Sequence, residues 1–288
     1  MIHFPPKVIL VPMDLLDPSF KALSQASLLA EAFGAQIEIL HVLPAPAGSA
    51  PYYWDQTPDH KRRREAVAAI RRRLPTDAPI DVLEGDPVSA ILHAAYLRRA
   101  GMIVMGSHGR SGWGRVLFGS TAEAVVRSSP VPVMVVRGVP GTIHSILAPL
   151  SFSPYALDAF RYAGKLAKTL DARLTALHAV SKGETPASVG RRMRSWVGSL
   201  PRGLKHACRA RIIAEEPPAA VIARAASEHD AVVLAVHRHG ALRDAILGTT
   251  AEQVLRRWPG LMIAVPPARL SSAAERASRL KLARAANK

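Results

Sequence analysis

A glycine-rich segment that follows an apolar run is the part of this sequence best suited to chemistry. Residues 106–121, GSHGRSGWGRVLFGST, contain five glycines and come directly after MIVM. Glycines let backbone N–H groups approach an anion closely, and the N-terminus of a following helix adds partial positive charge. Gly106 and Gly109 leave room for a sugar or a phosphate, while Ser120 and Thr121 open the next predicted helix. The segment therefore predicts a phosphate site.

The order of its residues separates this segment from two other phosphate loops. It lacks the GxxxxGK[ST] order, and no GxGxxG opens the first helix, so neither a P-loop ATPase nor a dinucleotide fold is supported. Arg110 and Arg115 lie between the glycines and add positive charge. Two plainer interpretations stay open: the glycines form only a flexible loop, and Asp14 only caps a helix, although Asp17 is better placed for capping.

Composition limits the classes of function. The chain of 288 residues is long enough for two domains with their own cores, and 49% of its residues are apolar. No apolar stretch reaches the roughly 18 residues of a membrane span, and no export signal is recognisable. We interpret the single cysteine, Cys208, as a thiol on a helix face, and a single cysteine suits a reducing compartment. We therefore expect a cytoplasmic protein. The formal charge of +16 is spread over several helices without a nucleic-acid-binding motif, so we expect solvated helix faces and no nucleic-acid partner.

The chain is internally repeated. Pro12 matches Pro149 and His41 matches His178, in both cases 137 residues further on. The repeated histidines follow apolar strands, and we interpret them as hydrogen-bonded structural residues rather than catalytic bases. We place the first domain at 1–140, the second at 141–267, and a basic tail without assigned function at 268–288.

Each copy alternates strand and helix patterns. In the first copy the predicted strands are 7–13, 35–42, 79–85, 101–106 and 131–137, and the predicted helices are 17–33, 59–74, 86–100 and 120–129. Gly34 and Gly101 serve as stop signals after two of these helices. Parallel strands need crossover connections, so each copy predicts an α/β domain with a doubly wound parallel sheet covered by helices on both faces.

The spacing G-x2-G-x9-G-[ST] resembles that of the universal stress protein family, together with VPMD at the first strand end, LHV at the second and VPVMVV at the fifth. The resemblance covers residues 7–137 and 144–266. It implies two fused Rossmann-like domains, each with five strands in the order 3-2-1-4-5, and an ATP site at the switch point between strands one and four.

The resemblance also implies how ATP would bind, with or without Mg²⁺, as a regulatory ligand. Asp14 would accept a hydrogen bond from the adenine or the ribose, the backbone of Val42 would border the adenine, and the glycine segment would hold ribose and phosphates. We expect no catalytic residue and no metal-binding residue of the protein. The implied nucleotide-binding residues are Pro12, Met13, Asp14, Val42, Met105, Gly106, Ser107, His108, Gly109, Arg110, Gly119, Ser120 and Thr121.

The second copy departs from this pattern. Ser151 replaces the aspartate, Ala235 replaces the first glycine and Arg238 replaces the second, while Gly248 and Thr249 persist. We therefore expect one ATP per chain, with the second domain in a structural role.

The resemblance also implies an internal pseudo-dimer, because members of that family commonly dimerise through the edge strand after the motif. In a fused pair the two edge strands, VPVMVV and LMIAVP, would pair with each other. A homodimer of whole chains stays open, and we expect no membrane partner. Two other functions are considered. A weak ATPase or phosphotransfer enzyme is disfavoured because no carboxylate or lysine follows the motif. A nucleotide-free interaction module would use the positive charge to recruit an acidic partner.

Overall fold

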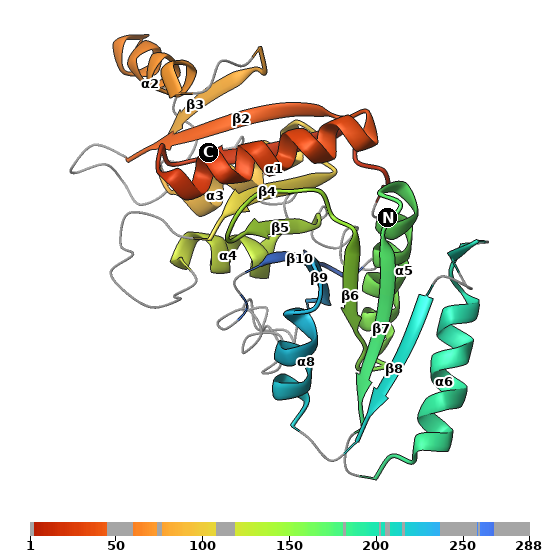
Figure 1. Ribbon diagram of the computed structural model, residues 1–288. Helices are drawn as coiled ribbons and strands as arrows, with labels where there is room; N and C mark the ends of the chain where they lie inside the picture. The colour runs from red at the N-terminus through yellow and green to blue at the C-terminus, as the bar shows by residue number, and fades with distance from the viewer. Residues whose placement is uncertain are drawn as a thin grey trace, which may run out of the picture.

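The computed structural model describes residues 3–44, 60–73, 77–107, 119–180, 183–201, 203–204, 208–214, 217–236, 258 and 260–267. In the first half, strands alternate with helices as the sequence predicts (Figure 1). These elements are β1 Val8–Met13, α1 Asp17–Phe33, β2 Gln36–Leu43, α2 His60–Arg73, β3 Ile80–Glu84, α3 Pro87–Leu97, β4 Met102–Gly106, α4 Ser120–Ser128 and β5 Val133–Val136.

The second half repeats this alternation. Its elements are β6 Ser145–Pro149, α5 Pro154–Thr169, β7 Arg173–Ala179, α6 Pro186–Gly198, β8 Cys208–Ile213, α8 Pro218–Ala226, β9 Ala231–Ala235 and β10 Leu261–Val265. The interpretation of Cys208 as a helix-face thiol is wrong, because this residue begins strand β8. Burial raises the pKa of its thiol to about 11, so the thiolate is disfavoured.

The two stop signals behave differently. Gly34 ends α1 in the left-handed conformation, with φ 62°, as predicted. Helix α3 ends before Gly101, and the left-handed residue after it is Arg99, with φ 52°. Gly101 is required for another reason: a Cβ there would lie 2.8 Å from the Cα of Pro6.

One ten-stranded sheet runs through both halves in the order β3-β2-β1-β4-β5-β10-β9-β6-β7-β8. Each half has the predicted order 3-2-1-4-5, with parallel neighbours. The halves join where β5 pairs with β10 antiparallel, with Met262 opposite Val135, which confirms the expected pairing of the two edge strands. Because this pair is antiparallel, the carboxyl ends of the strands lie at opposite edges of the sheet in the two halves.

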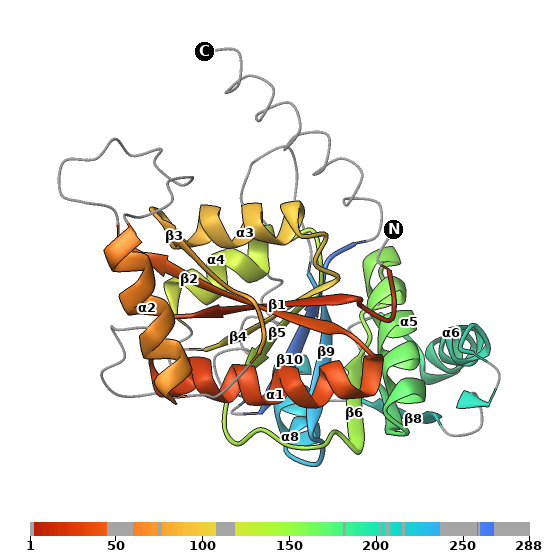
Figure 2. The ribbon, with the colours of Figure 1, turned by 90° about the horizontal axis from the view of Figure 1, so that it is seen from above.

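Two apolar cores lie on the two faces of the sheet. In the first half, α1 covers one face while α3 and α4 cover the other (Figure 2). One core includes residues of α1 and α5, and the other includes residues of α3, α4 and α8. Strands buried on both faces read as continuous apolar runs, which is why β4 and β5 lack the alternation of a half-exposed strand.

The segments that lead into β1 and β6 each contact the first helix of the other half. Phe4, before β1, meets Tyr162 of α5 edge-on, with ring centroids 5.3 Å apart. The N–H of Gly141, before β6, donates to Oε1 of Gln25 in α1 over 2.9 Å, and Nε2 of Gln25 donates to the carbonyl oxygen of Gly141 over 3.1 Å. Both contacts use matching positions, 137 residues apart. Reciprocal contacts therefore join the halves in addition to the β5–β10 pair.

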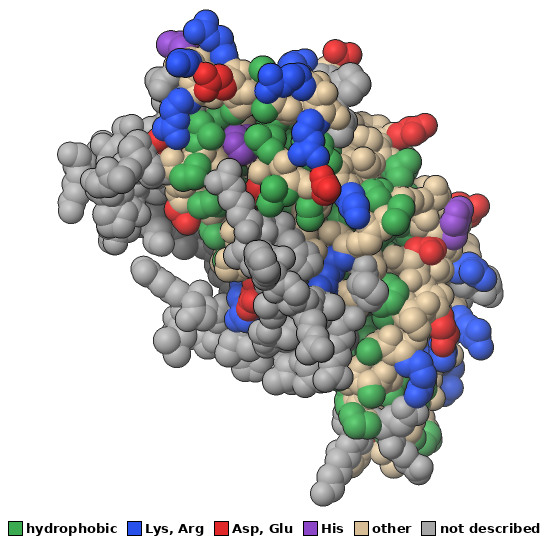
Figure 3. All heavy atoms as spheres, turned by 60° about the vertical axis from the view of Figure 1, so that its left-hand side comes forward, with side chains coloured by type: hydrophobic (Ala, Val, Ile, Leu, Met, Phe, Trp, Pro, Cys, Tyr) green, Lys and Arg blue, Asp and Glu red, His purple; other side chains and the backbone are tan. Residues whose placement is uncertain are grey.

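Basic side chains gather on α2, at the top of the molecule in Figure 3. Several of them form ion pairs: Arg62 with Glu84, Arg63 with Asp81, and Arg73 with Asp17. Of these three pairs, Arg73–Asp17 is exposed at both partners, and an exposed pair contributes little stability, whereas the Glu84 carboxylate is buried. No helix within the described ranges is long and apolar enough to cross a membrane.

Candidate functional site

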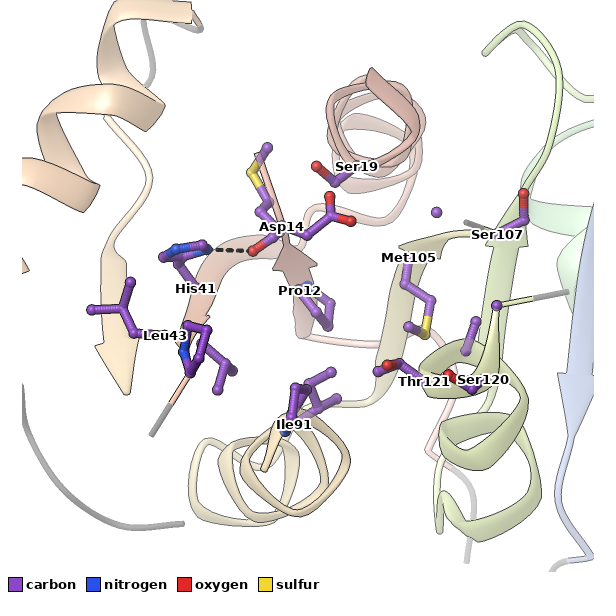
Figure 4. A pocket seen from close by; sticks show the side chains of 17 residues that line it. Pro12, Asp14, Ser19, His41, Leu43, Ile91, Met105, Ser107, Ser120 and Thr121 are labelled. Carbon is purple, nitrogen blue, oxygen red and sulfur yellow. Dashed lines mark hydrogen bonds between the residues drawn. The ribbon is translucent and has the colours of Figure 1, made fainter. Parts of the chain in front are cut away.

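A pocket of ≈ 450 Å³ opens at the carboxyl ends of β1 and β4, where the strand order of the first half reverses (Figure 4). This volume lies within the usual range of ligand sites. The predicted nucleotide-binding residues that the structure describes all line this pocket: Pro12, Met13, Asp14, Val42, Met105, Gly106, Ser107, Gly119, Ser120 and Thr121. His108, Gly109 and Arg110 lie outside the described residues. Contact of any of these residues with a ligand stays a prediction.

Asp14 lies in the turn between β1 and α1. One carboxylate oxygen accepts a hydrogen bond of 3.1 Å from the N–H of Leu16, and the described residues give the other oxygen no partner. Leu16 is the N-cap of α1, and no side chain caps this helix end. The interpretation of Asp14 or Asp17 as a cap is therefore wrong, because Asp14 stabilises the turn and Asp17 is the first helical residue.

The N-terminus of α4 forms the opposite side of the pocket. The N–H of Gly119 donates to the carbonyl oxygen of Ser107 over 2.7 Å, which ties the start of this helix to the end of β4. Gly119 is the N-cap and supplies no side-chain hydrogen bond. The first N–H groups of a helix have no acceptor within it and carry partial positive charge, so this side of the pocket favours an anion.

Gly106 has a structural role that the sequence reasoning missed. A Cβ at this position would lie 2.8 Å from the carbonyl carbon and oxygen of Pro18, in the first turn of α1. The glycine is thus needed for the close approach of β4 to this helix, whether or not a ligand is present. For the same reason, Ala235 at the matching position of β9 says nothing by itself about ligand access in the second half.

The repeated histidines are buried and hydrogen-bonded, which confirms the expected hydrogen bonds; that neither acts as a catalytic base stays a prediction. Nδ1 of His41 lies 2.6 Å from the carbonyl oxygen of Met13, and Nδ1 of His178 lies 2.7 Å from that of Leu150. Sequence reasoning missed that His41 also lines the pocket. It missed the other lining residues as well, which are Ser19, Leu43, Pro44, Pro87, Ile91 and Ala122.

The turn after β6 in the second half is built differently from the turn after β1. Ser151, at the position of Asp14, is exposed, and its hydroxyl lies 3.1 Å from the hydroxyl of Ser153. Ser153 caps α5 by accepting from the N–H of Ala156. Arg238, Gly248 and Thr249 lie outside the described residues. The described residues contain no group of three or more His, Cys, Asp or Glu side chains arranged to hold a metal ion.

The fold defines an α/β protein of two doubly wound, mostly parallel halves joined into one sheet. The model of the universal stress protein family matches residues 6–137 and 142–266. The chain therefore belongs to the universal stress protein family and is a tandem member with two copies of the domain.

Known proteins similar to the chain include single-domain and longer relatives. It is 34% identical to a universal stress protein of Thermus aquaticus, over 46% of this chain and 98% of that one. It is 29% identical to the Na⁺/H⁺ antiporter NhaS5 of Synechocystis, over 75% of this chain and only 32% of the antiporter. The crystal structure of a universal stress protein from Archaeoglobus fulgidus superposes with a TM-score of 0.70 at 23% identity, over 91% of this chain and 99% of that one, which shows the shared fold.

Proposed function

We propose that this chain is a cytoplasmic stress-response protein whose first half binds ATP as a regulatory ligand, with or without Mg²⁺, and whose second half is structural. The observation that carries the proposal is the polarity of the pocket. The Asp14 carboxylate, an acceptor, lines one side, and the N-terminus of α4, a set of donors, lines the other. A nucleotide has hydroxyl and amino donors at one end and phosphate acceptors at the other, so its polarity matches that of the pocket.

The pocket walls support a specific orientation of the nucleotide. Ile91 and Met105 supply apolar surface between the two polar sides, which suits a purine base and a sugar (Figure 4). The free oxygen of Asp14 would accept from the ribose or the base. The phosphates would lie at Ser120 and Thr121, where two hydroxyls add to the N–H groups of the helix.

The second half supports a structural role through its turn after β6. Ser151 is shorter than aspartate and uncharged, and its hydroxyl already meets Ser153. A hydrogen bond to a charged group contributes about 1.5–3 kcal/mol. A ligand in the second half would therefore bind without the strongest contact that we propose for the first.

Titration calorimetry of ATP with the intact chain tests this proposal. Asp14→Ser introduces the residue of the second half into the first, and we expect it to weaken binding about 10- to 100-fold. Ser151→Ala is the matched control and should leave the affinity unchanged. An Asp14→Ser chain that binds ATP as well as the wild type, or a Ser151→Ala chain that binds it less well, would show that the site is elsewhere. A phosphate-release assay on the wild type tests the regulatory role, and multiple turnovers would contradict it.

A further inference from the structure

The two strand-end histidines make the same contact through Nδ1 and differ at Nε2. In His41 and His178, Nδ1 lies next to a backbone carbonyl oxygen of the preceding strand end. A carbonyl oxygen only accepts hydrogen bonds, so Nδ1 carries a proton in both rings. What meets Nε2 then decides what each ring can do.

In the second half, the chain itself fills the Nε2 position. The Glu184 carboxylate lies 2.8 Å from Nε2 of His178, and Arg192 of α6 donates to the same carboxylate over 2.9 Å. The Arg192 guanidinium lies 4.2 Å from the centroid of the Phe152 ring, and that ring contacts His178 with centroids 4.5 Å apart. A connected cluster of charged and aromatic groups thus closes the free edge of this histidine.

In the first half, the described residues place no hydrogen-bond partner on Nε2 of His41. The ring lines the pocket, beside the end of β1 (Figure 4). Nε2 is not fully buried and keeps some accessible surface, although the residue as a whole is only 6% exposed. In the neutral ring with Nδ1–H, Nε2 is an acceptor. An unmet acceptor on a pocket wall is a place for a ligand donor.

We infer that His41 contacts the nucleotide: Nε2 accepts a hydrogen bond from a donor of the bound nucleoside, and the bond from Nδ1 to Met13 fixes the ring in the tautomer that this contact needs. The inference rests on the proposed function, since it adds a contact to the same pocket. Asp14 and Nε2 are both acceptors, so this side of the pocket selects hydroxyl or amino groups. Phosphate oxygens only accept, and they gain nothing there.

A pair of matched variants separates a ligand contact from a structural role. His41→Asn keeps a side-chain N–H close to the position of Nδ1 and removes Nε2. We expect it to raise the Kd for ATP about 5- to 10-fold, the effect of one hydrogen bond, while the chain stays folded by circular dichroism. His178→Asn removes the Nε2 that meets Glu184, and we expect it to lower the melting temperature and leave the Kd unchanged.

Nucleoside analogues identify the donor. Purine riboside lacks the exocyclic amine, and 2′- and 3′-deoxyadenosine each lack one hydroxyl. For the analogue that lacks the group facing Nε2, the wild type and His41→Asn should have equal affinity. For the other two analogues, the wild type should bind more tightly than His41→Asn. An equal loss of affinity for all three analogues would overturn the inference.

The wild-type chain provides a test that does not depend on how the variants fold. We expect the ¹⁵N resonance of Nε2 of His41 to shift when adenosine is added, with no comparable shift for His178. A wild type that binds ATP without this shift, or a folded His41→Asn chain with wild-type affinity, overturns the inference and leaves the proposed function intact. A wild type that binds no adenine nucleotide overturns both.

Discussion

Replacing Gln25 measures how strongly the segment between the two halves is held. The amide of Gln25 meets both the N–H and the carbonyl group of Gly141, and the side chain is only 1% exposed. In Gln25→Met, a side chain of similar length keeps the apolar contacts of α1 but meets neither backbone group. Each lost hydrogen bond costs about 1 kcal/mol, and an unmet buried polar group adds a similar cost. We therefore expect the free energy of unfolding to fall by about 2–3 kcal/mol.

Urea denaturation followed by circular dichroism measures this change. The midpoint should fall with an unchanged slope, because the surface exposed on unfolding stays the same. Gln36→Met, at an exposed position of β2, is the control and should change stability by less than about 0.5 kcal/mol. The reasoning would be refuted by a Gln25→Met chain as stable as the wild type, or by equal losses in the two variants.

Three further predictions concern buried or hydrogen-bonded groups. Tyr162→Phe removes a buried hydroxyl that has no hydrogen-bond partner among the described residues, so the melting temperature should stay equal or rise; a fall of more than about 3 °C would contradict this. Burial raises the pKa of the Cys208 thiol to about 11 from an ordinary value of 9.0, so the contribution of this thiol to stability is present below about pH 9 and is lost as the pH rises toward 11. A thiol reagent should therefore react slowly with the folded chain at about pH 8, and rapid labelling would contradict the burial. Burial opposes ionisation of Asp230, but hydrogen bonds from Ser145 and His144 outweigh this effect and lower the pKa of the carboxyl, so its contribution to stability is lost as the pH falls below about 4. Asp230→Asn should cost about 1 kcal/mol near neutral pH and should reduce this acid dependence in urea denaturation. Equal acid sensitivity of the two chains would count against the prediction.

The fold could be predicted because local pattern and long-range order agree. Continuous apolar runs indicated the buried strands, and the matching positions 137 residues further on extended the prediction to the second half. Cys208 was missed because the segment around it is rich in arginine, which suggested a helix face. The better signal was the alternation of Arg209 and Arg211 with Ala210 and Ile212, which has the period of a strand.

The pocket was predicted only in part, because some of its lining depends on tertiary placement. Motif spacing places Asp14 near Thr121, since both follow strands that are neighbours at the switch point. His41 and Ile91 come from β2 and α3, and nothing local shows that they reach the same cavity. The close approach of Pro18 to Gly106 is likewise a matter of helix placement.

Native mass spectrometry of the intact chain with excess ATP tests the central claim most directly, because it counts bound nucleotides. The polarity of the first pocket and the altered turn of the second half predict one ATP per wild-type chain. The same experiment on Asp14→Ser should show a largely empty chain. Two ATP molecules per wild-type chain, none at all, or one that persists unchanged in Asp14→Ser, would contradict the assignment of the first half as the nucleotide site.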